Sequence, residues 1–186
     1  MEKMLQDRRV YELLEKVDRD LALRAQAVGC EHCGGTIHRG DYTRKPRGGP
    51  DWDKRYSFCC SREGCRKRKT PPSVRFLGRK VYIGVVVVLV SAMMHGLSRG
   101  RVRRLCQSLG IDRRTLQHWR EWWVGTFAQG WFWRGVQGRF RRPILAERLP
   151  VGLVEAFGAW QSNGVVSLLK FLCPITTSSC KEVVAM

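Results

Sequence analysis

Closely spaced cysteines in a segment with little apolar material constrain the fold of this chain more than any other feature. The chain has eight cysteines, and five of them fall within 36 residues: Cys30, Cys33, Cys59, Cys60 and Cys65. The segment 30–70 around them is rich in Gly, Pro, Arg and Lys. Because it offers little for a hydrophobic core, we expect a metal held by thiolates to order it.

The first cysteine pair has the spacing of a metal-binding knuckle. Cys30 and Cys33 are separated by two residues, which lets both thiolates face one ion, and Gly34 and Gly35 let the backbone turn tightly after them. His32 and His38 are not expected to be ligands, because the cysteines suffice.

The second pair leaves one ligand open. Cys65 follows a longer loop, and either Cys60 or Cys59 can begin it. If Tyr56, Phe58 and Cys60 share one face of a strand, Cys59 points away, so Cys60 is favoured. The sequence therefore predicts a structural zinc ion with a closed shell of four thiolates: Cys30, Cys33, Cys60 and Cys65.

The amino-terminal residues and the cysteines together predict a reducing compartment. Residues 1–20 are charged throughout and lack the apolar run of a signal peptide. The apolar run Val81–Met94 is shorter than the roughly 20 residues that span a bilayer, so it predicts a buried core element. We expect a cytoplasmic, nucleoid-associated protein without a membrane partner.

The charge favours a polyanion as partner. Lys and Arg total 34 against 16 Asp and Glu, which gives a formal charge of +18 and a pI near 10.3. Residues 1–29 are neutral, whereas residues 39–80 carry fourteen basic and four acidic residues. Double-stranded DNA is the expected partner, and Lys45, Arg47, Arg66, Lys67 and Arg68 are expected to contact its phosphates.

Hydrophobic periodicity predicts a mainly α fold with a small β zinc ribbon. Residues 4–28 predict one amphipathic helix, and residues 55–58 predict a short strand. Pro71-Pro72 marks a boundary near residues 70–78. The expected domains are an amino-terminal helix over 1–29, the zinc ribbon over 30–72, a tri-helical domain over 73–142, and short helices over 143–186.

The tri-helical domain is predicted from three apolar-periodic segments: residues 79–95, 99–109 and 113–127. The valine run 85–88 also suits a buried strand, but the length of its segment favours a helix. Leu149–Ala159 and Val165–Leu172 predict two further helices separated by residues 162–164. The tail from Thr176 is expected to be frayed.

Residues 101–120 match a helix-turn-helix pattern. Val102, Leu105, Cys106 and Leu109 form an apolar stripe. Gly110 supplies a left-handed turn, Ile111 fills the space between the helices, and Asp112 caps the next one. Leu116, Trp119 and Trp123 continue the buried face. The residues left outside on the second helix are suited to DNA bases and phosphates: Arg113, Arg114, Thr115, Gln117 and His118.

The tryptophans after this segment have two interpretations. Trp122, Trp123, Trp131 and Trp133 could stack on unpaired bases. A tryptophan cluster that follows a short helical domain is more often part of its core, and we favour the core.

On these residues the chain resembles the amino-terminal recognition portion of zinc-ribbon-bearing insertion-sequence transposases and bacterial proteins of the same layout. The resemblance rests on the Cys-x2-Cys-Gly-Gly knuckle, the second cysteine pair with residues 66–73 after it, and residues 109–119. In those transposases a ribonuclease-H-like domain with three acidic residues would follow. Here no aspartate follows Asp112, and the segment with Glu147, Glu155 and Glu182 is too short for that fold.

These features predict a non-enzymatic double-stranded DNA-binding protein. The zinc ribbon would hold phosphates, the helix-turn-helix would read sequence, and a transposition or transcription protein could be a further partner. The alternatives are a transposase or nuclease fragment that acts on DNA, or an RNA- or ribosome-associated zinc-ribbon protein.

Overall fold

A computed structural model describes residues 5, 7–43, 54–77, 84–94 and 98–177, without the side chains of Leu105, Ser108 and Leu109. The described residues divide into two compact units. The cysteine unit comprises residues 5–84 and 169–177, and the aromatic unit comprises residues 85–168. The predicted division into four domains stays a prediction.

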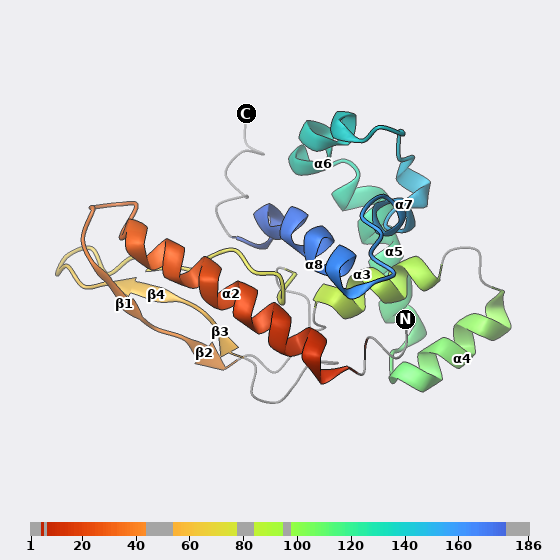
Figure 1. Cartoon of the computed structure of the whole chain (residues 1–186), viewed down its shortest axis with the longest axis horizontal. Helices are drawn as coiled ribbons and strands as arrows, with labels where there is room; N and C mark the ends of the chain where they lie inside the picture. Colours follow the sequence, from red (N-terminus) through yellow and green to blue (C-terminus); the bar gives the residue numbers. More distant parts are fainter. Residues whose placement is uncertain (1–4, 6, 44–53, 78–83, 95–97, 178–186) are drawn as a thin grey trace. The chain divides into compact units, whose positions relative to one another are not determined.

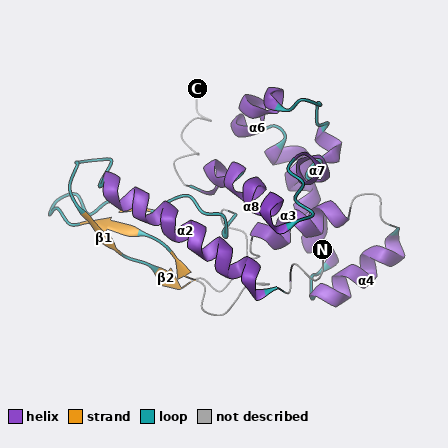
Figure 2. Cartoon of the chain, in the orientation of Figure 1, coloured by secondary structure: helices purple, strands orange, loops and turns teal. Residues whose placement is uncertain are grey.

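The fold is mainly helical with a small antiparallel β region, as the sequence predicted (Figure 2). All described strands lie in the cysteine unit. In chain order its elements are α2 (Arg8–Val28), β1 (Ile37–Arg39), β2 (Tyr42–Thr43), β3 (Lys54–Arg55), β4 (Phe58–Cys60), β5 (Arg68–Lys69) and η4 (Cys173–Thr176).

The strands form two small sheets. β4 lies between β1 and β5 and is antiparallel to both, and β2 pairs with β3. The predicted strand over residues 55–58 is wrong in its bounds, because Arg55 ends β3 and Phe58 begins β4. The interruption is caused by residues earlier in the chain: the amide of Ser57 donates to the Asp41 carboxylate at 3.0 Å, and the carbonyl of Ser57 accepts from the amide of Gly40.

The predicted amino-terminal helix is confirmed as α2, which runs alongside β1 and β4 in Figure 1. Asp7 caps its start by accepting from the amide of Arg9 at 2.9 Å, and Gly29 ends it. Ala22 packs in one apolar cluster with Ile37 and Phe58 of the sheet. The expectation that the cysteine segment lacks a core is therefore wrong in part, because α2 supplies one side of a small core.

A buried ion pair ties α2 to the chain after the sheets. Asp18 and Arg75 are each 1% exposed, and Arg75 Nε donates to the Asp18 carboxylate at 2.9 Å. The same carboxylate accepts from the hydroxyl of Ser73 at 2.5 Å and the amide of Val74 at 2.6 Å. A buried carboxylate needs such partners because desolvation is costly.

The carboxy-terminal segment joins the same network. The amide of Ser73 donates to the hydroxyl of Thr176 at 3.0 Å, and that hydroxyl donates to the carbonyl of Cys173 at 2.6 Å. Thr176 is buried, so the expectation of a frayed chain from this residue on is wrong at its first position. The rest of the predicted tail, residues 178–186, lies outside the described residues.

The aromatic unit is helical in all its described elements. They are α3 (Gly84–Met93, of which Gly84 belongs to the cysteine unit), α4 (Arg99–Leu109), α5 (Arg113–Glu121), the π-helical turn η1 (Trp122–Phe127), α6 (Trp131–Val136), η2 (Gln137–Arg139), η3 (Ala146–Arg148), α7 (Val151–Ala156) and α8 (Ser162–Phe171, whose last three residues belong to the cysteine unit).

The valine run forms a helix, not a strand. Val85 to Val90 are all buried within α3, so burial on every side outweighs the weak helix preference of valine. The predicted separator 162–164 is wrong, because these residues form the first turn of α8. The chain turns earlier, at Gly158, where the amide of Ala159 donates to the carbonyl of Val154 at 2.7 Å.

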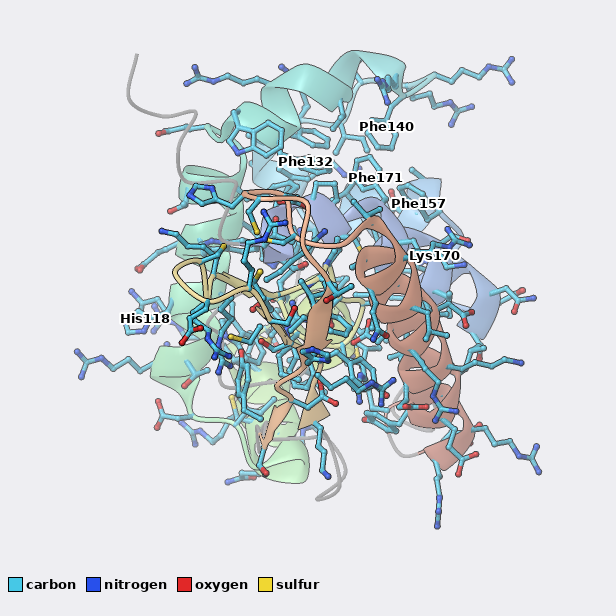
Figure 3. All side chains as sticks on the ribbon, turned by 90° about the vertical axis from the view of Figure 1, so that its left-hand side faces the viewer. His118, Phe132, Phe140, Phe157, Lys170 and Phe171 are labelled. Carbon is cyan, nitrogen blue, oxygen red and sulfur yellow. The ribbon has the colours of Figure 1, made fainter. Side chains whose placement is uncertain are left out.

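Aromatic side chains form much of the core of this unit. Phe127 lies in the middle, with its ring centroid 4.9 Å from that of Trp123 and 5.6 Å from that of Trp133. Trp133 continues the contact to Phe140, with the ring centroids 5.7 Å apart. Phe140 is labelled in Figure 3. Trp123 is fully buried, so the core interpretation holds for Trp123 and Trp133.

Candidate metal centre and candidate nucleic-acid interface

The first cysteine knuckle follows directly on α2. After Gly29 the chain folds back on itself: the amide of Cys30 donates to the carbonyl of Gly35 at 2.9 Å, and the amide of Gly34 donates to the carbonyl of Cys30 at 2.8 Å. These two bonds close the knuckle and fix the positions of Cys30 and Cys33.

The second knuckle follows β4 and closes in the same way. The amide of Cys60 donates to the carbonyl of Lys67 at 3.0 Å, and the amide of Arg66 donates to the carbonyl of Arg62 at 3.3 Å. Cys60 pairs with Ile37 across the sheet, which brings the second knuckle beside the first.

Four sulfur atoms meet between the knuckles. Those of Cys30, Cys33, Cys60 and Cys65 all lie within 4.8 Å of one another. The Sγ–Sγ distances are 3.8 Å for Cys30 and Cys65 and 3.5 Å for Cys33 and Cys60, too long for the roughly 2.05 Å of a disulfide. Metal–sulfur bonds of about 2.3 Å in a tetrahedron place the sulfurs about 3.8 Å apart. The group therefore fits one metal ion.

The structure selects Cys60 and not Cys59 for this group. Cys60 is 1% exposed and lies in the cluster, whereas Cys59 lies on the other side of β4 and its thiol donates to the carbonyl of Arg66 at 3.4 Å. His32 and His38 are exposed and do not belong to the group. The alternation along the strand thus predicted which of the two cysteines lies in the cluster.

The environment of the four thiols is uneven. The backbone amides of His32 and Cys33 lower the pKa of the Cys30 thiol to about 7. At Cys60 the backbone amide of Arg62 favours the thiolate, but desolvation and the neighbouring thiols outweigh it and raise the pKa to about 12. One thiol therefore ionises readily, and a bound cation would favour ionisation of the others.

The basic residues after Cys65 divide into two kinds. Lys69 is occupied, because its ammonium donates to the carbonyl of Ala25 in the last turn of α2 at 3.3 Å and to that of Gly29 just after the helix at 3.2 Å. Arg68 donates to the carbonyl of Gly40 and the hydroxyl of Ser57, both at 3.3 Å.

Arg66 and Lys67 are different, because both are exposed and neither side chain has a hydrogen bond or ion pair within the described residues. Of the five predicted phosphate contacts in this region, Lys45 and Arg47 lie outside the described residues. Arg66 and Lys67 are available to an external anion, and Arg68 is partly engaged by the fold.

In the aromatic unit, α4 and α5 are joined by a tight turn with the predicted features. Gly110 is left-handed, with φ +60°, and Ile111 after it is 3% exposed. The Asp112 carboxylate caps α5 by accepting from the amide of Arg114 at 2.6 Å. The stripe predicted on α4 is described only for Val102 and Cys106, which are half-buried.

The two faces of α5 separate as predicted. Leu116, Trp119 and Trp123 are buried. The predicted contact residues are exposed, apart from half-buried Thr115: Arg113, Arg114, Gln117 and His118, the last labelled in Figure 3. The side-chain amide of Gln117 donates to the Glu121 carboxylate at 3.0 Å, which holds it along the helix.

A set of arginines on α4 adds to this surface and was not among the predicted site residues. All four are exposed, and α4 contains no acidic residue: Arg99, Arg101, Arg103 and Arg104. Residues 85–168 contain twelve arginines, four acidic residues and no lysine. The charge count by helix could have found this set, and arginine is well suited to phosphate because its guanidinium forms paired hydrogen bonds.

Trp131 is the most exposed of the described tryptophans in this region, at 41%, while Trp122 is half-buried. The interpretation of the cluster as a base-stacking platform is therefore wrong for Trp123 and Trp133, because the core already covers their rings.

No protein-family model, no curated protein and no solved structure matches the chain. None of the described helices is both long and apolar enough to cross a membrane.

Proposed function

We propose that the chain is a non-enzymatic double-stranded DNA-binding protein, in which a zinc ribbon holds phosphates and a helix-turn-helix reads sequence. The observation that carries the proposal is α5: a helix capped by Asp112 that buries Trp119 and presents polar side chains outward. Arg113 can bond the edge of a guanine and Gln117 that of an adenine in the major groove.

The geometry of the turn supports a helix-turn-helix. Two helices of 11 and 9 residues are joined through a left-handed Gly110 and a buried Ile111. In this motif the amino-terminal end of the second helix enters the major groove, and this end carries Arg113 and Arg114. The exposed arginines of α4 would then neutralise phosphates beside it.

The donor set supports zinc as the metal. Four thiolates in a tetrahedral arrangement suit Zn²⁺, and they close its coordination shell. A closed shell leaves no position for a substrate, so the ion would have a structural role. The cysteine unit would then offer Arg66 and Lys67 to the DNA backbone, together with the guanidinium donors of Arg68 that the fold does not engage.

The same donor set would give this ion no catalytic role. Four thiolates would close its shell, whereas the transfer of phosphodiesters by two metal ions uses carboxylate ligands. We propose that the chain is related to the recognition portion of insertion-sequence transposases and acts in the cytoplasm at the nucleoid. A transposition or transcription protein is the expected protein partner.

Binding to a random duplex across a salt series tests the proposal. We expect the affinity of the zinc-loaded chain to fall steeply with salt, because each neutralised phosphate adds about 0.9 to the slope of log K against log salt. An affinity independent of salt would contradict the proposal. Stronger competition by structured RNA than by duplex DNA would favour an RNA-associated protein, and nicking that depends on Mg²⁺ would favour a nuclease.

Two kinds of variant separate sequence reading from backbone binding. Arg113→Ala or Gln117→Ala should lose about 1–3 kcal/mol on a preferred site and relax the preference at one base. Lys67→Ala should weaken binding to all sequences alike and reduce the salt slope by about one. If the α5 variants, like Lys67→Ala, weakened binding to every sequence equally, α5 would not read the DNA sequence.

A further inference from the structure

The two cysteine knuckles are built on the same backbone pattern but differ at one position. In each knuckle the amide of the first cysteine donates to the carbonyl two residues after the last one, Gly35 or Lys67. In each, the residue directly after the last cysteine donates to the carbonyl four residues before it. Gly34 and Arg66 therefore occupy equivalent positions.

This position requires a left-handed backbone. Gly34 has φ +67° and Arg66 has φ +45°. Arg66 is the only residue other than glycine with a positive φ in the described part of the chain. A side chain is disfavoured in this conformation and glycine is not, so arginine makes the second knuckle less stable than glycine would.

The backbone conformation serves the metal site, but the side chain does not. The amide of Arg66 donates to the carbonyl of Arg62, and the carbonyl of Lys67 accepts from the amide of Cys60, so the turn at Arg66 orients the knuckle. The guanidinium of Arg66 is exposed and has no partner among the described residues. Glycine at this position would close the knuckle as well.

Space does not explain the difference either. A Cβ atom at Gly34 would meet no atom within 4 Å, so the first knuckle has room for a side chain and lacks one. The second knuckle has an arginine in a left-handed conformation that arginine disfavours, and exposed Lys67 follows it. A residue retained in a disfavoured conformation points to a functional role.

We propose that the two knuckles divide their roles at this position: the second binds both metal and DNA, with Arg66 contacting a phosphate from its disfavoured backbone conformation, while the first binds metal alone. This inference rests on the proposed function, because the anion is a phosphate of duplex DNA. The two knuckles would thus share one fold and divide its roles. Arg66 would be a binding residue retained at the expense of stability.

The test compares Arg66→Gly with the wild type as zinc-loaded, full-length proteins. Binding to a fluorescent duplex is titrated across a salt series, and thermal unfolding is measured in parallel. We expect the slope of log K against log salt to fall by about 0.9, hence roughly eight-fold weaker binding near 0.1 M salt if affinities converge near 1 M. We expect the melting temperature to stay equal or rise.

Two further variants act as controls. Arg24→Ala removes one exposed arginine from α2 and should change binding much less than Arg66→Gly. The exchange of Gly34→Arg together with Arg66→Gly keeps composition and net charge, and should bind as weakly as Arg66→Gly alone if position matters. Arg66→Lys should retain most of the affinity.

Each outcome decides the proposal. Binding by Arg66→Gly equal to that of the wild type, or no weaker than that of Arg24→Ala, would overturn it while leaving DNA binding intact. A lower melting temperature for Arg66→Gly would assign Arg66 a structural role and also overturn it. A wild type whose duplex affinity does not depend on salt would overturn the proposed function first, and this inference with it.

Discussion

The cysteine unit and the aromatic unit reach a stable interior by different means. The cysteine unit has a small apolar cluster that includes Cys30 and Cys60, and it adds a buried ion pair between Asp18 and Arg75. The aromatic unit packs rings around Phe127, and it buries the run Val85 to Val90 of α3. The first therefore depends on specific polar partners, and the second on buried apolar area.

This difference predicts opposite sensitivities. In the cysteine unit, removal of one cysteine of the cluster or one partner of the ion pair leaves a buried polar group without its partner. The free-energy cost of that unpaired group is larger than the net stabilisation that the intact interaction contributes. Removing an aromatic side chain loses burial and leaves a cavity. Each variant, and metal removal, should therefore destabilise only one of the two units. Residue-specific hydrogen exchange measures the stability of both units in the same sample.

The largest expected effect is that of metal removal. Cys60→Ser or a strong chelator should unfold β1, β4 and both knuckles, because zinc binding contributes about 10–16 kcal/mol in zinc-finger peptides, as much as a whole domain's stability. The amide signals of residues 85–168 should be retained. Cys59→Ser is the matched control and should change neither, since Cys59 is outside the cluster. Unchanged strand signals after chelation would contradict a structural metal.

Loss of the buried ion pair should be the next largest effect. Asp18→Ala leaves the Arg75 charge without its carboxylate and should destabilise the cysteine unit by about 3–5 kcal/mol in urea unfolding. Asp20→Ala, an exposed position on the same helix, is the control and should have little effect. A similar loss for both variants would show that the pair does not stabilise this unit.

An aromatic truncation should act in the other unit with similar size. Trp123→Ala should destabilise residues 85–168 by about 3–5 kcal/mol, because its side chain is 0% exposed. Trp131→Ala removes the same side chain from a position that is 41% exposed and should cost much less. Protection of the knuckle amides should not change in either variant, and if it falls, the two units are not independent.

The smallest expected effects come from helix caps, one in each unit. Asp112→Ala should destabilise α5 by about 1 kcal/mol, and Asp7→Ala should do the same for α2. Hydrogen exchange in the first turn of each helix measures them separately. An effect of Asp112→Ala on hydrogen exchange outside the aromatic unit would show that the two units are not independent.

Local signals made the helices and the cluster of four cysteines predictable. Gly29 ends α2, Gly110 ends α4 and Asp112 caps the start of α5. Each of these residues acts on a helix only a few residues away. The cysteine spacing and strand alternation were enough to choose Cys60. These features need no knowledge of distant contacts.

Features that depend on distant residues were missed. The buried role of Asp18 depends on Arg75, 57 residues away, and in the sequence Asp18 is one of six acidic residues in the neutral segment 1–29. The division of the strand after Arg55 depends on Asp41. The attachment of Thr176 to Ser73 spans 103 residues. Periodicity cannot show such pairings, because they are set by the tertiary fold.

Selection from a random duplex DNA library measures whether α5 reads a DNA sequence. The zinc-loaded chain should enrich a defined motif, and Arg113→Ala should weaken the preference at one position of it while leaving salt-dependent binding in place. An enriched pool without any motif, at an affinity that still falls with salt, would contradict sequence reading by α5 and reduce the aromatic unit to a basic scaffold.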